Sequence, residues 1–226
     1  MKILSWTTFM AFGVLVTGAL LAGSTVFAQG AAPEPAVVKL PQPTFNGDTS
    51  VEKALQERRS VRAYKDQPVT LAEVSQLLWA AQGITEPEKG MRTAPSPRAA
   101  YLIKVYLVAG RGADLPPGMY QYQPKGHELM RVSGGDKKGD LFNAAGQAAI
   151  KAAPIALLFT GTKSGVPNPA WMYLETGHAS ENVYLEAVSL KLGTVAMAGF
   201  KADDVRKALD IDAKEEPIYI MPVGRK

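Results

Sequence analysis

The sequence of 226 residues contains no cysteine and only two histidines, His127 and His178. Without cysteine the chain has no disulfide, no thiol nucleophile and no iron–sulfur cluster. Two histidines that are far apart in the sequence also argue against a histidine-rich metal site. The chemistry of any site must therefore come from other side chains, from the backbone or from a bound organic group.

The sequence also lacks a long basic stripe with interleaved aromatic residues, so nothing in it indicates nucleic-acid binding. The formal net charge is only +4, and lysine and arginine are scattered along the chain. This mild basicity is compatible with an anionic ligand or with proximity to a membrane. No side chain stands out as a catalytic acid or base.

The first apolar run, Phe9–Ala22, is short for a membrane span, which needs about 20 residues. It follows the positive charge of Lys2 and precedes Val26-Phe27-Ala28, a pattern that predicts cleavage before Gln29. We therefore expect residues 1–28 to be a cleavable export signal, and the mature protein to be periplasmic or secreted without a membrane span. The alternative is an uncleaved membrane anchor.

The mature chain is expected to have two parts. Residues 29–47 are rich in alanine, proline and glycine, which favours a flexible spacer. Residues 48–226 have a length that suits one domain with a substantial core.

Helix capping residues give the clearest local predictions. Ser50 suits the N-cap of a short helix that ends near Glu57. Thr70 and Glu73 form a capping-box pattern, which predicts a helix that ends near Gly83.

Hydrophobic periodicity predicts the remaining elements. Strands are expected at 101–109, 119–122, 128–132, 155–160, 194–198 and 218–223, with helices at 136–151, 170–192 and 202–209. The mixture indicates an α+β domain. Apolar residues lie on nearly all sides of the helix at 170–192, so we expect it in the core or in a dimer interface.

The most informative segment is Arg58-Arg59-Ser60-Val61-Arg62, between two predicted helices. Arginine binds phosphate oxygens in pairs and keeps its charge, so this cluster predicts a phosphate site. The alternative is a solvated helix end whose arginines contact the final carbonyl groups.

Several motifs occur in the order found in one known family. ERRSVRAY is followed by LAEVSQLLWAAQGI and APSPRAAYLIKVYLVA, and later by ETG, LG and PVG. Over residues 50 to 224 the chain resembles the nitroreductase family of FMN-dependent enzymes, and is closest to its SagB-type dehydrogenase branch. The resemblance implies a nitroreductase-like fold with a mostly antiparallel central sheet flanked by helices. It also implies a homodimer with flavins at the subunit interface.

The resemblance further implies roles for the arginine segment and the chain end. Arg58, Ser60 and Arg62 would contact the FMN phosphate or ribityl chain, and Arg59 would contribute partly through its backbone and partly near the flavin ring. Many relatives continue past the PVG motif and supply another basic residue to the phosphate. Here Arg225 would replace that residue, or the short end would be frayed and solvated.

Two other segments are implied to border the flavin ring. Pro95-Ser96 match a motif that lies against the flavin, although Pro97-Arg98 stand where small residues are expected. Ala198 or Gly199 would supply the backbone N–H that binds flavin N5. His178 is expected to have a packing role, because it shares a helix face with apolar residues.

The implied function is an exported FMN-dependent oxidoreductase whose flavin carries the chemistry, with no catalytic side chain and no metal. The electron donor stays open among NAD(P)H, a quinol and a protein. Other enzymatic readings are azoline dehydrogenation and reductive dehalogenation. A non-enzymatic flavin or tetrapyrrole binder, or a cofactor-free dimeric scaffold, is the alternative of a different class.

Overall fold

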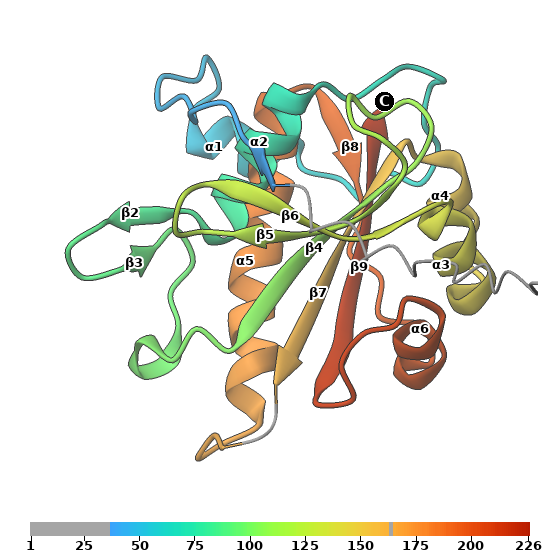
Figure 1. The fold of residues 1–226 in the computed structure, drawn as a ribbon. Coiled ribbons are helices and arrows are strands. Elements are labelled where there is room, and N and C mark those ends of the chain that lie inside the picture. The colour runs from blue at the N-terminus through green and yellow to red at the C-terminus, as the bar shows by residue number, and fades with distance from the viewer. Residues whose placement is uncertain (1–36, 163–164) are drawn as a thin grey trace, which may run out of the picture. The chain divides into compact units, whose positions relative to one another are not determined.

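The computed structural model describes residues 37–162 and 165–226, so the predicted export signal and residues 29–36 lie outside the described residues. Its centre is a seven-stranded sheet in the order β1-β6-β5-β4-β7-β9-β8 (Figure 1). Every neighbouring pair in this sheet is antiparallel. The strands are β1 (Val37–Lys39), β4 (Ile103–Ala109), β5 (Gly118–Gln123), β6 (Glu128–Gly134), β7 (Ile155–Thr162), β8 (Leu192–Thr194) and β9 (Glu215–Arg225).

Helices cover both faces of the sheet (Figure 1). One face packs against α2 and α5, with α1 beside α5, and the other face packs against α3, α4 and α6. The helices are α1 (Val51–Glu57), α2 (Leu71–Gln82), α3 (Lys137–Ala145), α4 (Ala148–Ala152), α5 (Ala170–Ser189) and α6 (Ala202–Ala208). The predicted α+β class with an antiparallel sheet is confirmed.

Alternation along the central strands divides the core into two clusters. Leu107 and Leu157 face the cluster that contains α2 and α5. Val108 and Leu158, the next residue of each strand, face the cluster that contains Ile150 of α4. Successive strand residues point to opposite faces, so these strands are buried on both sides and read as continuous apolar runs in the sequence.

Both predicted helix starts are confirmed. The Ser50 side chain accepts a hydrogen bond from the Lys53 N–H at 3.2 Å. At the start of α2, Thr70 Oγ1 accepts from the Glu73 N–H, and the Glu73 carboxylate accepts from the Thr70 N–H at 2.8 Å. Side chains thus satisfy N–H groups that the first helical turn leaves unpaired.

Two of the predicted helices end earlier than expected. The helix predicted at 136–151 is two helices, because Gly146 adopts a left-handed conformation (φ 66°) that ends α3. The helix predicted at 170–192 ends at Ser189. Lys191 has a positive φ of 58°, and Leu192 already belongs to β8.

The last two strands have other bounds than the sequence predicted. The strand predicted at 194–198 is β8, which ends at Thr194, and beyond it only Met197 pairs, with Ile220. The final strand is longer than predicted, because β9 pairs with both β7 and β8. The hairpin of β2 (Ile84–Glu86) and β3 (Met91–Arg92), which stands apart from the main sheet in Figure 1, was not predicted.

The prediction of a flexible spacer is wrong for residues 37–47. β1 extends the sheet by pairing with β6, and the Thr44 N–H donates to Gln76 Oε1 at 2.9 Å. His127 Nε2 lies 2.6 Å from Ser75 Oγ and 3.0 Å from the Pro41 carbonyl, and burial lowers the pKa of His127. These contacts join distant parts of the chain, so composition could not predict them.

A close approach at Gly193 fixes the chain between α1 and α2 against the sheet. A Cβ atom at Gly193 would lie 2.8 Å from Val61 Cβ and 2.7 Å from its Cγ1. Distances this short require the backbone to move, so residue 193 must be glycine for Val61 to pack here.

We predict that Gly193→Ala lowers the free energy of unfolding by about 1–3 kcal/mol, the usual cost of overpacking. Gly177→Ala is the matched control, because nothing lies within 4 Å of a Cβ there. In a helix interior alanine is more favourable than glycine by about 1 kcal/mol, so this variant should be at least as stable as the wild type. Urea denaturation measures both. Equal stability of Gly193→Ala and the wild type would contradict the close packing.

Candidate functional site

The arginine segment lies along the edge of the main sheet. Ser60 forms a parallel bridge with Thr194 of the edge strand β8, and the Val61 N–H donates to the Thr194 carbonyl at 2.9 Å. The Lys65 N–H donates to the Arg225 carbonyl at 2.9 Å. Backbone hydrogen bonds thus hold a loop that carries three arginines.

Arg58 and Arg59 have different surroundings. Arg59 Nη1 donates to the carbonyls of Gln56 and Arg58 at 2.9 and 2.7 Å, which is the contact expected of a basic residue at a helix end. The Arg58 guanidinium lies 5.0 Å from the Tyr184 ring centroid, and its Nε is 3.9 Å from the Glu181 carboxylate. This long, solvent-accessible ion pair leaves Arg58 available to a bound anion.

The chain end is ordered, and the expectation of a frayed, solvated terminus is wrong. Arg225 belongs to β9, and its Nη1 lies 2.6 Å from Glu73 Oε1. Arg225 Nη2 also donates to Glu73 Oε2 at 2.9 Å. The charge of Arg225 is therefore largely neutralised within the chain, whereas the Arg62 side chain is exposed.

Tyr184 of α5 joins the arginine segment to the chain that follows β8. Its hydroxyl lies 3.2 Å from Ser60 Oγ and accepts a hydrogen bond from the Ala196 N–H at 2.7 Å. Sequence reasoning missed this residue, because a tyrosine on the inner side of a long helix resembles any core aromatic residue.

Ala198 and Gly199 lie farther along the same chain and are exposed. Neither N–H donates to another described residue, while the Gly199 carbonyl accepts from Gln147 Nε2 at 2.9 Å. Ala198 lines a cavity of about 290 Å³, together with Tyr173, Phe200 and others. A ligand could therefore reach these backbone N–H groups.

Ser96 has its hydroxyl committed to the fold of its own loop. Ser96 Oγ donates to Glu175 Oε2 at 2.9 Å and accepts from the Tyr101 N–H at 2.8 Å. Glu175 is fully buried and also accepts from the Leu102 N–H at 2.9 Å. His178 Nδ1 lies 3.2 Å from the Pro95 carbonyl, so α5 holds this loop at two points.

The same loop has a strained backbone. Arg98, Ala99 and Tyr101 have positive φ values of 56°, 53° and 46°, a conformation that costs about 1–2 kcal/mol for each residue other than glycine. The Arg92 guanidinium lies 4.3 Å from the Tyr101 ring centroid, and burial lowers the pKa of Arg92. Strain of this kind persists only where surrounding contacts fix the loop, and Glu175 and Arg92 provide them here. Arg98 itself is exposed.

One chain does not bring Ser96 to the arginine segment. Ser96 contacts α5 at Glu175, and Arg58 and Ser60 contact it at Tyr184. Nine helical positions correspond to roughly 13 Å along the axis and about half a turn around it. The two groups therefore lie on opposite sides of α5.

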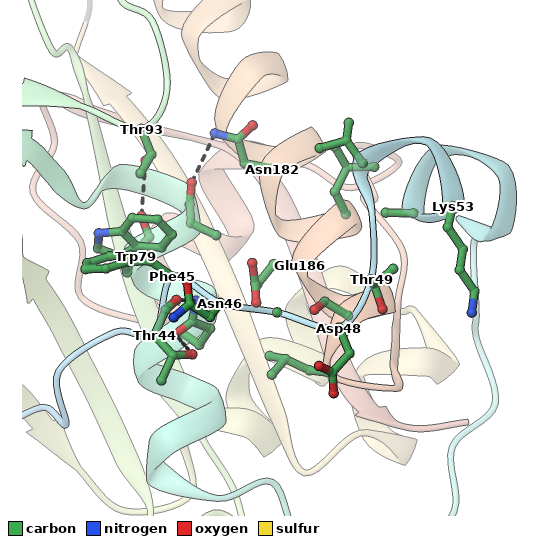
Figure 2. A pocket seen from close by; sticks show the side chains of 18 of the residues that line it. Thr44, Phe45, Asn46, Asp48, Thr49, Lys53, Trp79, Thr93, Asn182 and Glu186 are labelled. Atoms are coloured by element: carbon green, nitrogen blue, oxygen red, sulfur yellow. Dashed lines mark hydrogen bonds between the residues drawn. The ribbon is translucent and has the colours of Figure 1, made fainter.

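A separate cavity of about 890 Å³ lies between α2, α5 and residues 44–49 (Figure 2). The Phe45 and Trp79 rings form a tilted pair with centroids 5.3 Å apart at one wall. Glu186 of α5 lines the cavity opposite residues 46–48, and burial raises its pKa. None of the arginines at positions 58, 59 and 62 lines this cavity.

In the described part of the chain, no group of histidine, aspartate and glutamate side chains is arranged to hold a metal ion. Among residues 37–162 and 165–226, no helix is long and apolar enough to cross a membrane. The site offers guanidinium groups, a hydroxyl group and free backbone N–H groups, which suit an organic ligand that carries an anionic group.

The chain belongs to the nitroreductase family, whose family model matches residues 55–225. A predicted nitroreductase of Methanocaldococcus jannaschii is 37% identical over 186 residues, which cover 79% of this chain and 92% of that protein. The family expected from the motifs is therefore confirmed.

Solved structures have the same fold. A predicted nitroreductase from Ralstonia eutropha is similar with a TM-score of 0.73 and 30% identity, over 87% of this chain and 95% of that one. A Desulfovibrio desulfuricans protein of the same kind, solved in complex with FMN, has a TM-score of 0.60 and 19% identity, over 79% of this chain and 87% of that one. The nitroreductase-like fold predicted from the sequence is confirmed.

We predict that Ser96→Ala lowers the free energy of unfolding by about 1–3 kcal/mol, because it leaves the buried Glu175 carboxylate and the Tyr101 N–H without this partner. Ser133→Ala is the matched control, since its buried hydroxyl has no hydrogen-bond partner among the described residues and its loss should be nearly neutral. Urea denaturation compares the two. An equal effect of both substitutions would show that the Ser96 bonds contribute no stability.

Proposed function

We propose that this protein is an FMN-dependent oxidoreductase that transfers two electrons between a donor and a small-molecule acceptor. Membership of the nitroreductase family supports an oxidoreductase, and a structural neighbour contains FMN. When bound, FMN supplies the hydride and electron transfer. The chain's part is to bind and orient the cofactor.

The observation that carries this proposal is the continuity of the site. The arginine segment is hydrogen-bonded to β8, and the chain leaving β8 leads to the exposed Ala198 and Gly199. Arg58, Ser60 and Arg62 would hold the phosphate group, and a backbone N–H at Ala198 or Gly199 would face the ring. Arg225 is a weaker candidate for the phosphate, because Glu73 already neutralises it.

The test is an absorbance spectrum of the protein from Gln29 onward, after FMN is added and the excess removed. Retained flavin bands, bleached by an electron donor such as NAD(P)H or a quinol, support the enzyme. Retained bands that no donor bleaches favour a flavin-binding protein. A folded, colourless protein would overturn the cofactor assignment and favour a tetrapyrrole binder or a scaffold.

Arg58→Ala and Arg62→Ala are each expected to weaken FMN binding by about 1.5–3 kcal/mol, the range for hydrogen bonds to charged groups. Binding of riboflavin, which lacks the phosphate, should change little. Arg111→Ala, an exposed arginine in another loop, is the control. Titration of flavin fluorescence measures these affinities, and unchanged FMN affinity in both variants would contradict the phosphate site.

We also propose that the protein is a homodimer. If Ser96 and the arginine segment both border one flavin, they must come from different copies, because they lie on opposite sides of α5. Exposed apolar side chains beside α5 support this proposal: Val51 and Leu55 are 64% and 55% exposed. They lie four positions apart on one face of α1, and such patches mark interaction surfaces.

Leu55→Glu should therefore convert a dimer into a monomer and weaken FMN binding, since a carboxylate would be buried in the interface. Val132→Glu, at an exposed apolar position on β6, should leave the dimer intact. Sedimentation equilibrium measures the mass. A monomeric wild-type protein that still holds FMN would overturn the proposal.

Export to the periplasm or cell exterior stays a prediction from residues 1–28. The natural donor and acceptor would be identified by screening donors and acceptors with the FMN-loaded protein, and the azoline substrates implied by the SagB-type branch belong among the compounds screened.

A further inference from the structure

Tyr184 occupies a position between two parts of the proposed flavin site. It is 9% exposed, and its hydroxyl contacts Ser60 on one side and the Ala196 N–H on the other. The Arg58 guanidinium carbon lies over its ring, 5.0 Å from the ring centroid. Among the described residues, no other side chain is hydrogen-bonded both to Ser60 and to the backbone between β8 and Ala198.

The hydrogen-bond directions at Tyr184 follow from counting protons. The Ala196 N–H can only donate, so the phenol oxygen accepts there. The Tyr184 O–H can then donate a hydrogen bond to Ser60 Oγ, and the Ser60 O–H can donate one to a bound anion. Successive bonds of this kind polarise one another, so the last hydroxyl becomes a better donor.

The backbone around Ser60 is held by a second phenol. Tyr64 donates to the Val61 carbonyl at 2.7 Å and lies 3.1 Å from the Pro222 carbonyl. Burial is the main cause that raises the pKa of Tyr64, so it stays protonated and remains a donor. The Ser60 hydroxyl is therefore presented from a fixed backbone.

We propose that Tyr184 is a positioning residue that orients the Ser60 hydroxyl and the Arg58 guanidinium toward the flavin phosphate, and fixes the Ala196 backbone that leads to the ring. This inference rests on the proposed function. It predicts that Tyr184 supports binding of the phosphate more than binding of the rest of the flavin.

The test compares FMN with riboflavin, which has the same ring and ribityl chain without the phosphate. Tyr184→Phe keeps the aromatic ring and removes only the hydroxyl. We expect FMN to bind about tenfold more weakly, as for loss of a hydrogen bond that supports a charged group, with less than about threefold change for riboflavin. The absorbance maximum of bound FMN should also shift, because the Ala196 N–H loses its acceptor.

Tyr120→Phe is the matched control. Tyr120 is also buried, and its hydroxyl donates to the Pro116 carbonyl at 2.7 Å, away from the arginine segment. Its loss should leave both flavin affinities within about twofold of wild type. Circular dichroism and thermal unfolding of all variants establish that they fold.

A second variant keeps the test independent of the folding of Tyr184→Phe. Ser60→Ala removes the other end of the hydrogen-bond chain at an exposed position, and should weaken FMN about tenfold while leaving riboflavin unchanged. In the Ser60→Ala background, Tyr184→Phe should have a smaller effect than in the wild type, because the two hydroxyls act in series.

The outcomes separate this inference from the proposed function. A wild-type protein that binds no FMN overturns both. A wild-type protein that binds FMN, with Tyr184→Phe or Ser60→Ala binding it equally well, overturns only the role of Tyr184. Equal losses of FMN and riboflavin affinity in Tyr184→Phe also overturn it, since they indicate a general packing role.

Discussion

The contact on which the site depends is the pairing of the arginine segment with the edge of the sheet. A loop with three arginines in five residues repels itself, and only neighbouring structure can hold it in place. Here the Val61 N–H bonds to the Thr194 carbonyl, and Lys65 bonds to Arg225. The pairing is possible because Gly193 has no side chain where Val61 packs. The anion site is thus built on backbone contacts, which leave the Arg58 and Arg62 side chains available to a ligand.

Charge compensation divides the basic residues into two groups. Arg59 is held by carbonyl oxygens and Arg225 by the Glu73 carboxylate, so each is largely occupied within the chain. Among the described residues, the Arg58 side chain has as partners only the Tyr184 ring and the Glu181 carboxylate, which lies 3.9 Å from its Nε, and such exposed pairs contribute little. Arg58 and the exposed Arg62 therefore keep most of their attraction for an anion, which a count of arginines in the sequence does not reveal.

Local signals in the sequence predicted much of the fold, because they act over a few residues. The caps at Ser50 and Thr70 depend on side chains three positions from their partners, so both helices were predicted with correct starts. The break at Gly146 was missed because the alanine-rich pattern continues through it. The sequence did not predict that residues 37–47 are ordered, because the residues that bind them, such as Gln76 and the strand β6, are distant in sequence. Tyr184 shows the same limit at the site, since its role depends on two segments that only the fold brings together.

The geometry of α5 explains why one chain cannot form a site that uses both Ser96 and Arg58. Its buried positions contact the strained loop at Glu175 and the arginine segment at Tyr184, and these positions face opposite sides of the helix. A rigid helix cannot bring both to one ligand. A second copy, related by a two-fold axis, could present its Ser96 loop to the first copy's arginine segment, and the symmetry would create two equal sites. In the proposed dimer the strain at Arg98 and Ala99 has a reason, because a loop that fits against another subunit needs one fixed conformation.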